Sequence, residues 1–317
     1  MRTSVRFERG VVVVSDPRTD LVFPPLPLEE WEDTKDTLHR YAQIVGKVRL
    51  ACSPHRNHWW QVPLYVSTRG LTTSPIPYRN ITFEISFDLM DNRLAVATSE
   101  GGGFAFHLDD VPVAEFYRRL FEGLDTLGIA VSIDNRPFDL DDEHTLDENV
   151  HHSVCDRDHT RRYWRVLVRV DQVFKEFAGR FNGKTSPVHL FWHSFDLALT
   201  RFSGRRAPER EGADKVTREA YSHEVISFGF WPGDRQVRVP AFYSYTAPEP
   251  EGLTDQPLRP EGAFWAPEGG MALLMYDDLR EEESPKSALL EFLQSAYEAG
   301  ARTAGWNIED FRAATAL

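Results

Sequence analysis

The chain has 317 residues, of which 41% are hydrophobic and 12% aromatic, so it can bury a sizeable globular core. Its 49 acidic and 36 basic residues give a net charge of −13, which argues against a broad surface for nucleic acid or for anionic membranes. Only two cysteines occur, and no apolar stretch approaches the roughly 18 residues that a membrane span needs. We therefore expect a soluble cytoplasmic protein with no nucleic acid and no membrane as partner.

The first part of the chain predicts a short strand, a helix, a group of strands and a second helix. A strand at 11–15 precedes a helix that begins near residue 28. Apolar residues at spacings of seven, three and four place one buried face on this helix: Trp31, Leu38, Tyr41 and Val45. Two prolines between 72 and 77 argue against a strand there. Strands are expected at 60–68, 83–87, 94–98 and 104–108, and a helix runs from Pro112 to Gly128.

A polar and mostly acidic segment follows, and we expect it to link two halves of the protein. The N-terminal half then covers 1–135, the acidic linker 136–158, and the C-terminal half 159–317. The second half opens with a helix at about 159–181 and closes with a helix from Pro285 to about Ala304. Between them, strands are expected at 188–202, 221–230, 237–246 and 271–276. In each half the sequence pattern therefore predicts a helix, then antiparallel strands, then a second helix, and this order indicates an α+β fold class.

A repeated spacing supports a relation between the two halves. Trp60 and Trp192 are each followed eight residues later by a Thr-Arg pair, Thr68-Arg69 in the first half and Thr200-Arg201 in the second. Each copy follows a predicted helix that carries a tryptophan of its own. The period of about 130 residues is typical of a structural unit used twice, and we expect an internal duplication. Coincidence stays open as the alternative, because these signals are short and the halves differ elsewhere.

Histidines that interrupt apolar, strand-like segments are the candidates for chemistry. His58 stands before Trp59-Trp60, while His189 and His193 flank Leu190-Phe191-Trp192 and would share one face of a strand. His223 and Tyr221 form a second pair on one face of a strand. We take His223, His189 and Tyr221 as the candidate catalytic residues. A zinc or iron site is the weaker alternative, because histidines in cores or on surfaces are commonly structural.

Arginines supply a candidate anion site in the second half. Arg201, Arg205 and Arg206 surround Ser203-Gly204, with Lys175 and Lys184 upstream. Guanidinium groups near aromatic rings suit carboxylates and phosphates, because their paired N–H donors match those anions. The alternative is internal pairing with Asp196, Glu219 or Glu224. The candidate ligand-binding residues are His58, Trp60, Trp192, Arg201 and Arg205.

Several strings together resemble an uncharacterised bacterial family, a domain of unknown function (DUF5996). These are Leu26-Pro-Leu-Glu-Glu-Trp31, His58-Trp-Trp-Gln-Val-Pro-Leu-Tyr65, Ser186-Pro-Val-His-Leu-Phe-Trp192, Ser194-Phe-Asp-Leu-Ala198, Thr200-Arg-Phe-Ser-Gly-Arg205 and Arg218-Glu-Ala-Tyr-Ser-His-Glu224. The resemblance covers residues 26–306 and implies a stand-alone bacterial cytoplasmic protein. It brings no activity, cofactor or catalytic residue. His193 stands where that family commonly has a glycine, which leaves His189 and His223 ahead of it as ligand-contacting residues.

We interpret the chain as a small-molecule enzyme with one site where the two halves meet. His58, Trp60, His189 and Trp192 would line an aromatic pocket, and the arginines would hold an anionic group of the substrate. The alternative is a non-catalytic ligand-binding or interaction protein that uses the same pocket. A third interpretation, in which these residues only fill two related cores, also remains. No cofactor and no metal is assigned.

Overall fold

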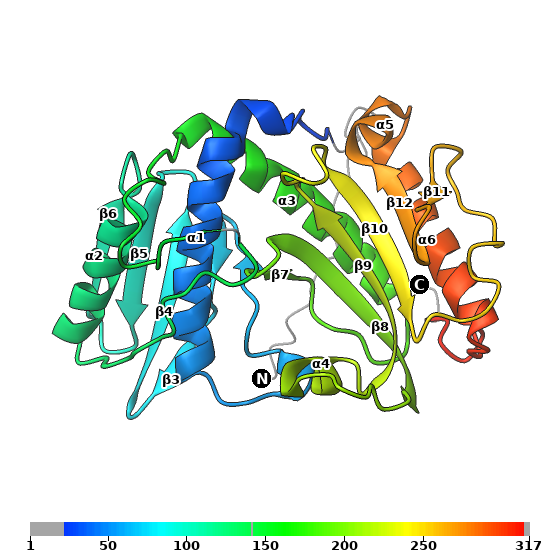
Figure 1. Cartoon of the computed structure of the whole chain (residues 1–317), viewed down its shortest axis with the longest axis horizontal. Coiled ribbons are helices and arrows are strands. Elements are labelled where there is room, and N and C mark those ends of the chain that lie inside the picture. The colour runs from blue at the N-terminus through cyan, green and yellow to red at the C-terminus, as the bar shows by residue number, and fades with distance from the viewer. Residues whose placement is uncertain (1–21, 141, 314–317) are drawn as a thin grey trace, which may run out of the picture.

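A computed structural model of the chain describes residues 22–140 and 142–313 and has an α+β fold, as the sequence predicts (Figure 1). The strand predicted at 11–15 lies outside the described residues. No helix within these two ranges combines the length and the apolar composition needed to cross a membrane. The helices of the described residues are α1 (Leu28–Cys52), α2 (Val113–Thr126), α3 (Arg157–Gly179), α4 (Lys215–Ala220), α5 (Tyr276–Glu281), α6 (Pro285–Thr303) and the short 3-10 helix η1 (Asn57–Trp59).

The first antiparallel sheet lies in the N-terminal part of the chain and has the order β1-β2-β4-β5-β6, with β3 paired to β4. In β4, Phe83, Ile85 and Phe87 are buried, and they alternate with partly exposed polar residues as predicted. Its strands are β1 (Tyr65–Val66), β2 (Gly70–Thr72), β3 (Ile76–Tyr78), β4 (Ile81–Asp88), β5 (Arg93–Thr98) and β6 (Gly103–His107).

The second antiparallel sheet has the order β11-β12-β10-β9-β8-β7. Its long central strands are the apolar segments that the sequence predicts, and they pair in continuous register from Leu197↔Phe230 to Phe202↔Val225. The strands are β7 (His189–Phe191), β8 (Asp196–Arg206), β9 (His223–Trp231), β10 (Ala241–Ala247), β11 (Phe264–Trp265) and β12 (Met271–Met275).

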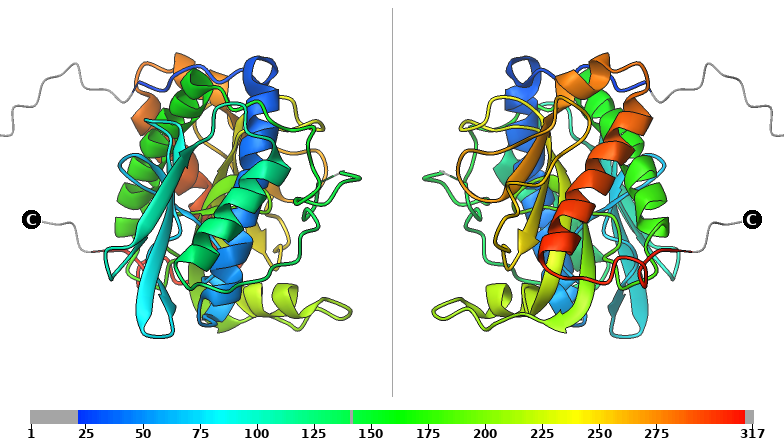
Figure 2. Two further views of the ribbon diagram at one scale, coloured as in Figure 1. Left: turned by 90° about the vertical axis from the view of Figure 1, so that its left-hand side faces the viewer. Right: turned by 90° about the vertical axis from the view of Figure 1, so that its right-hand side faces the viewer.

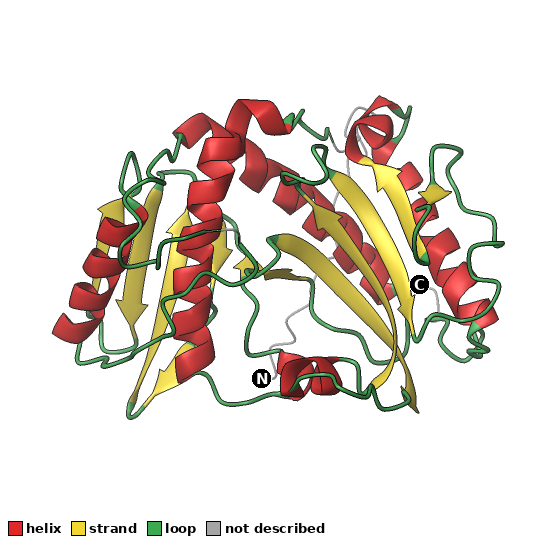
Figure 3. Cartoon of the chain, in the orientation of Figure 1, coloured by secondary structure: helices red, strands yellow, loops and turns green. Residues whose placement is uncertain are grey.

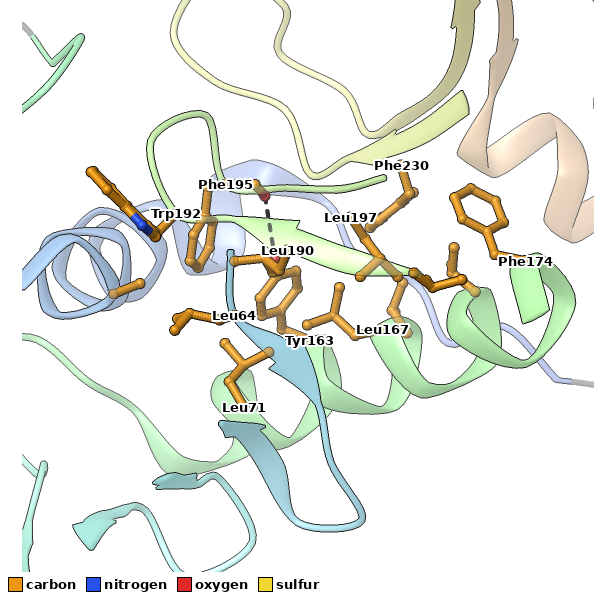
Figure 4. Close-up of a cluster of buried hydrophobic side chains, with 14 of the residues drawn as sticks. Leu64, Leu71, Tyr163, Leu167, Phe174, Leu190, Trp192, Phe195, Leu197 and Phe230 are labelled. Carbon is orange, nitrogen blue, oxygen red and sulfur yellow. Dashed lines mark hydrogen bonds between the residues drawn. The ribbon is translucent and has the colours of Figure 1, made fainter. Parts of the chain in front are cut away.

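The two sheets are joined edge to edge. Leu64, just before β1, and Leu190 in β7 exchange two backbone N–H···O hydrogen bonds of 2.8 Å each in an antiparallel bridge. Apolar side chains from both sheets and from α3 meet beside this bridge (Figure 4). One buried cluster accordingly extends from Phe23 to Trp306. Burial of such a continuous apolar volume is the main force that holds the sheets together.

The helices cover opposite sides of the joined sheets (Figure 2). On one side α2 packs on the first sheet through Phe116, which stacks between Tyr41 of α1 and Phe87 of β4 at centroid distances of 4.1 and 6.2 Å. On the other side α3 and α6 cover β8, β9 and β10. Among the described residues, no long helix packs on the opposite face of β8, β9 and β10, and this face carries the candidate site.

Helix α1 is buried on more than the one face that its apolar spacing predicts. Gln43 exchanges hydrogen bonds of 2.8 Å with the backbone N–H and C=O of Phe138, and Lys47 Nζ donates to Arg136 O at 2.5 Å. Arg40 forms an ion pair of 2.8 Å with Asp142. The acidic segment 136–158, predicted as a linker, thus lies along α1 and is fixed there by polar contacts.

Other predicted elements differ from the observed ones where turns and caps intervene. Of the strand predicted at 60–68, only Leu64 and Tyr65–Val66 are paired, Leu64 through its bridge to Leu190, because the chain before them forms η1. The strand predicted at 188–202 is broken by a turn at 192–195, closed by Phe195 in the left-handed region with φ 62°. A strand does form at 76–78 despite Pro77, since β3 lies at the sheet edge, where proline is tolerated.

The two copies of the Trp and Thr-Arg spacing do not occupy equivalent places. Thr68 and Arg69 lie in the turn between β1 and β2, and Arg69 forms ion pairs with Asp88 and Asp91. Thr200 and Arg201 lie in the middle of β8. The spacing is therefore no argument for a duplicated unit, even though both halves do run from a helix through antiparallel strands to a helix.

Candidate functional site

A cavity of about 620 Å³ lies on the face of the second sheet that α3 and α6 leave uncovered. This volume is within the range typical of small-molecule sites. Strand alternation sets the floor, because every second residue of β8, β9 and β10 points to this face. The floor residues are Asp196, Thr200 and Phe202 of β8, Val225 and Ser227 of β9, and Tyr243 and Tyr245 of β10.

The walls come from segments before and after the sheet. Leu50 at the end of α1, the η1 segment with His58, Trp59 and Trp60, and Val62 close one side. Helix α4, seen below the second sheet in Figure 3, brings Tyr221 to the lining. Phe138 of the acidic segment and the 192–195 turn contribute further lining residues. The cavity therefore combines residues from both halves of the chain. Its lining is rich in aromatic rings, which suits flat organic groups.

One end of the cavity holds a buried carboxylate. Asp196 is 6% exposed, and its oxygens accept hydrogen bonds from the hydroxyl groups of Ser194 and Tyr243. No Lys or Arg lies within ion-pair distance of Asp196 in the described part of the chain, and no Lys or Arg lines the cavity. Burial, with the nearby Asp196 charge, raises the pKa of Tyr243 well above its ordinary value, so this tyrosine stays a neutral donor. A buried carboxylate is normally matched by a cation.

His189 lies beside this end with its ring nitrogens unsatisfied. The residue is 1% exposed, and neither Nδ1 nor Nε2 has a hydrogen-bond partner among the described residues. Burial lowers its pKa to about 3, helped by the charges of Arg49 and His193, so the imidazole is neutral at physiological pH. One of its nitrogens is then a donor and the other an acceptor. Such an orphaned polar ring in a cavity wall is a candidate ligand contact.

The 192–195 turn is fixed from the α1 and α3 sides. His39 of α1 bonds through Nε2 to the carbonyl oxygens of Trp192 at 2.9 Å and His193 at 3.1 Å, and its ring stacks on Phe195 at 4.8 Å. Tyr163 of α3 donates to Phe195 O at 3.5 Å (Figure 4). The Trp192 indole donates to Val62 O at 2.9 Å, which ties the turn to the opposite wall. The turn is thus a rigid support for Asp196.

The other end of the cavity is basic. Lys184 Nζ lies 2.8 Å from His58 Nε2 and 5.1 and 4.8 Å from the ring centres of Trp60 and Phe202. The His223 ring lies 5.5 Å from that of His58. Burial lowers the pKa of His58, and the Lys184 charge lowers it further, so His58 is a neutral acceptor for the ammonium group. Burial also lowers the pKa of Lys184.

The structure brings together most of the candidate residues but not the arginines. His58, Trp60, His189, Trp192 and Tyr221 all line the cavity, and His223 contacts it through His58. Arg201 points to the helix-covered face instead, because it alternates with Thr200 along β8. It is 1% exposed, its guanidinium carbon lies 3.6 Å from the ring centre of Phe177, and it donates to the Phe177 carbonyl.

Arg205 also lies outside the cavity. It forms an ion pair of 2.7 Å with Glu224 and donates to the carbonyl oxygens of Ala304 and Gly305 at the end of α6. A positive side chain at the last carbonyls of a helix is a stabilising arrangement. The internal-pairing alternative therefore describes this residue. The expected arginine clamp for an anionic group has no geometric basis in the cavity.

Two pairs predicted on one strand are arranged differently. His193 lies in the turn after β7, so His189 and His193 do not alternate along one strand, although both line the cavity. Tyr221 ends α4 instead of standing in β9, and its hydroxyl lies 2.9 Å from that of Tyr245. In the described part of the chain, no group of three or more His, Cys, Asp or Glu side chains is arranged to hold a metal ion.

Sequence reasoning missed four residues of the site. Asp196 was considered only as an ion-pair partner, Lys184 only as a neighbour of the arginines, and Tyr243 and Tyr245 not at all. Asp196 lies an even number of positions before Thr200 and Phe202, so strand alternation puts all three on one face, and this was a usable signal. Helix α4 could have been found from Asp214, which caps it by accepting from the backbone N–H groups of Val216 and Thr217.

The chain matches a family described as a family of unknown function (DUF5996) over residues 23–313. It belongs to this family. The DUF5996 match includes every residue of the cavity floor and walls named above, so the site is part of the family's shared region. No curated protein and no solved structure matches the chain significantly. The function therefore has to be inferred from the site itself.

Proposed function

We propose that this DUF5996 protein binds a small organic molecule that carries a positively charged amine, with the amine at Asp196. The single observation that supports this is a buried carboxylate in an aromatic cavity to whose lining the described residues contribute no Lys or Arg. A cation placed there would gain a charge-assisted hydrogen bond and contacts with aromatic ring faces. This replaces the anionic substrate that the arginines predict, because Arg201 and Arg205 lie elsewhere.

Catalysis on the bound molecule is the second candidate, and His189 favours it. A neutral imidazole without partners can exchange a hydrogen bond or a proton with a ligand beside it. Tyr221 and His223 are less suited to this role. The hydroxyl of Tyr221 is paired to that of Tyr245, and His223 faces His58. A non-catalytic binding protein would need Asp196 and the aromatic lining only.

The test is a matched set of three ligands on one ring system: tryptamine, 3-ethylindole and indole-3-propionate. Binding is measured by thermal shift and by titration calorimetry. Tryptamine is expected to bind best, since only it carries an amine. Asp196→Asn is expected to weaken tryptamine by roughly 10- to 100-fold, the usual worth of a hydrogen bond to a charged group.

Asp214→Asn is the matched control. Asp214 also lines the cavity and carries a charge, but it caps α4, and asparagine caps a helix equally well. Its substitution is expected to leave tryptamine binding within about twofold, because the Asp214 carboxylate is exposed and its charge is screened by solvent and salt. Equal affinity for the three ligands, or equal losses in the two variants, would refute the amine site.

A further inference from the structure

Charged groups of opposite sign lie at the two ends of the cavity. Asp196 at one end has no Lys or Arg within 4.0 Å among the described residues, and His193 in the lining lies close enough to interact with its charge. At the other end Lys184 lies just outside the lining, beside His58, Trp60 and Phe202, and forms no ion pair with a described carboxylate. In contrast, Arg205 nearby is paired with the carboxylate of Glu224. A buried carboxylate without a matching cation, as at Asp196, is typical of a site that a charged ligand completes, whereas the exposed Lys184 is relevant because of its contacts with lining residues.

Lys184 is held in place by the residues that line the basic end. The backbone N–H of Phe202 donates to Lys184 O at 3.0 Å, which fixes the lysine beside the last floor residue of β8. Its ammonium group contacts His58 and lies near two rings of the cavity lining. An ammonium group in such a position keeps donors available, because His58 accepts only one of its three protons.

The backbone that presents His58 is strained. His58 and Trp59 both have positive φ values, 57° and 59°, in a region that non-glycine residues rarely adopt. Each such residue costs on the order of 1–3 kcal/mol, and consecutive ones persist only where the surroundings enforce them. The two residues turn His58 toward Lys184 and leave Trp59 and Trp60 in the cavity wall. The strain is therefore located where the basic end is built.

The two ends are far apart. Asp196 and Phe202 are six positions apart on β8 and face the same side, a span of about 20 Å at the usual rise of an extended strand. Between them the floor offers the hydroxyl pair of Thr200 and Ser227, which lie 3.0 Å apart. The floor between the two ends is therefore lined by rings and by hydroxyl groups.

We propose that the ligand is an extended zwitterion, with an amine at Asp196 and a carboxylate or phosphate at Lys184. The inference rests on the proposed function, which supplies the amine end, and adds the anionic end and the length. A short linear peptide with free termini has this chemistry, and so does an amine joined to a phosphate through an extended linker. A single small amine would satisfy Asp196 and leave Lys184 unpaired.

The test uses linear peptides of three, four and five residues built from Gly and Phe, together with amines of the same ring content. Each peptide is prepared with both termini free, with an acetylated N-terminus, with an amidated C-terminus, and with both blocked. Affinities are measured at low ionic strength, because Lys184 is exposed and its charge is screened by salt. The best free peptide is expected to bind at least tenfold more tightly than either singly blocked form.

Variants assign each terminus to its end of the cavity. In Lys184→Met, the peptide with a free carboxylate is expected to bind no more tightly than the amidated one, while a free amine still increases the affinity. In Asp196→Asn, the free amine is expected to add no affinity, while a free carboxylate still does. Lys215→Met, at the start of α4 and outside the cavity lining, is the control for net charge and should change neither advantage. For the alternative anion, an aminoalkyl phosphate is compared with its neutral alcohol in the same variants.

The outcomes separate the two proposals. If tryptamine binds through Asp196 but no zwitterion binds more tightly than its singly blocked form, the extended zwitterion is refuted and the amine site stands. The zwitterion is likewise refuted if, in Lys184→Met, the carboxylate or phosphate still increases the affinity over the neutral form as much as it does in the wild type. If neither tryptamine nor any free peptide depends on Asp196, the amine site itself is wrong.

Discussion

Gly46→Ala should destabilise the protein, although the substitution favours a helix. Gly46 lies in the interior of α1, where alanine is favoured over glycine by about 1 kcal/mol. A Cβ at this position would overlap the Trp192 indole, far inside van der Waals contact. The indole is a rigid ring, buried and bonded to Val62 O at 2.9 Å, so it cannot yield locally.

The magnitude follows from the opposing contributions. Overpacking a filled core costs about 1–3 kcal/mol, and losing the Trp192 hydrogen bond costs about 1 kcal/mol. Set against the gain of about 1 kcal/mol in helix propensity, the net loss in the free energy of unfolding is about 1–3 kcal/mol. Because Trp192 lines the cavity, tryptamine binding should weaken as well.

Urea denaturation followed by circular dichroism measures the change, and Gly179→Ala is the matched control. Gly179 ends α3, and a Cβ there would meet no atom within 4 Å, so alanine should be neutral or stabilise by up to about 1 kcal/mol. Combining Gly46→Ala with Trp192→Leu should recover part of the loss, since the two side chains are in direct conflict. Our packing argument fails if Gly46→Ala is as stable as the wild type or more stable.

The remaining predictions concern buried charge. Burial lowers the pKa values of His39 and His189 to about 3, so the unfolded chain binds these protons first and stability should fall as the pH drops from 6.5 toward 3. At pH 5 this amounts to about 2 kcal/mol per histidine, and His39→Gln should reduce the pH slope by one proton; an unchanged slope would contradict the assignment. Asp142→Asn should cost about 3–5 kcal/mol, because it leaves Arg40 buried and unpaired at 4% side-chain exposure. The double variant with Arg40→Met should recover most of that loss in the same denaturation assay, and equal losses in both would argue against the pair.

The sequence predicted the elements that follow from local periodicity. The helices α1, α2, α3 and α6 and the strands β4, β5 and β9 lie close to their predicted ranges, because their apolar residues repeat at the spacing of the element. Short elements whose existence depends on partners were missed. β3 forms only by pairing with β4, and α4 is six residues long and depends on the Asp214 cap.

The sequence analysis named aromatic and histidine residues that line the cavity, but it did not identify which charged residues belong to the site. His58, Trp60, His189 and Trp192 stood out because they interrupt apolar segments, and they line one cavity. Arg201 appeared equally suitable, but strand alternation directs it to the helix-covered face. Its environment depends on Phe177 and Tyr297, which are remote in sequence. Side-chain direction and long-range packing therefore decide which charges reach the site.

The bridge between Leu64 and Leu190 has a consequence for the behaviour of the chain at high concentration. A strand at the edge of a sheet presents unpaired backbone groups on which another molecule can add a strand and start aggregation. By pairing the edge beside β1 with the edge β7, each sheet covers an edge of the other. The bridge therefore also removes two edges at which copies of the chain could pair with one another. A chain cut between the two sheets would expose both edges to other molecules.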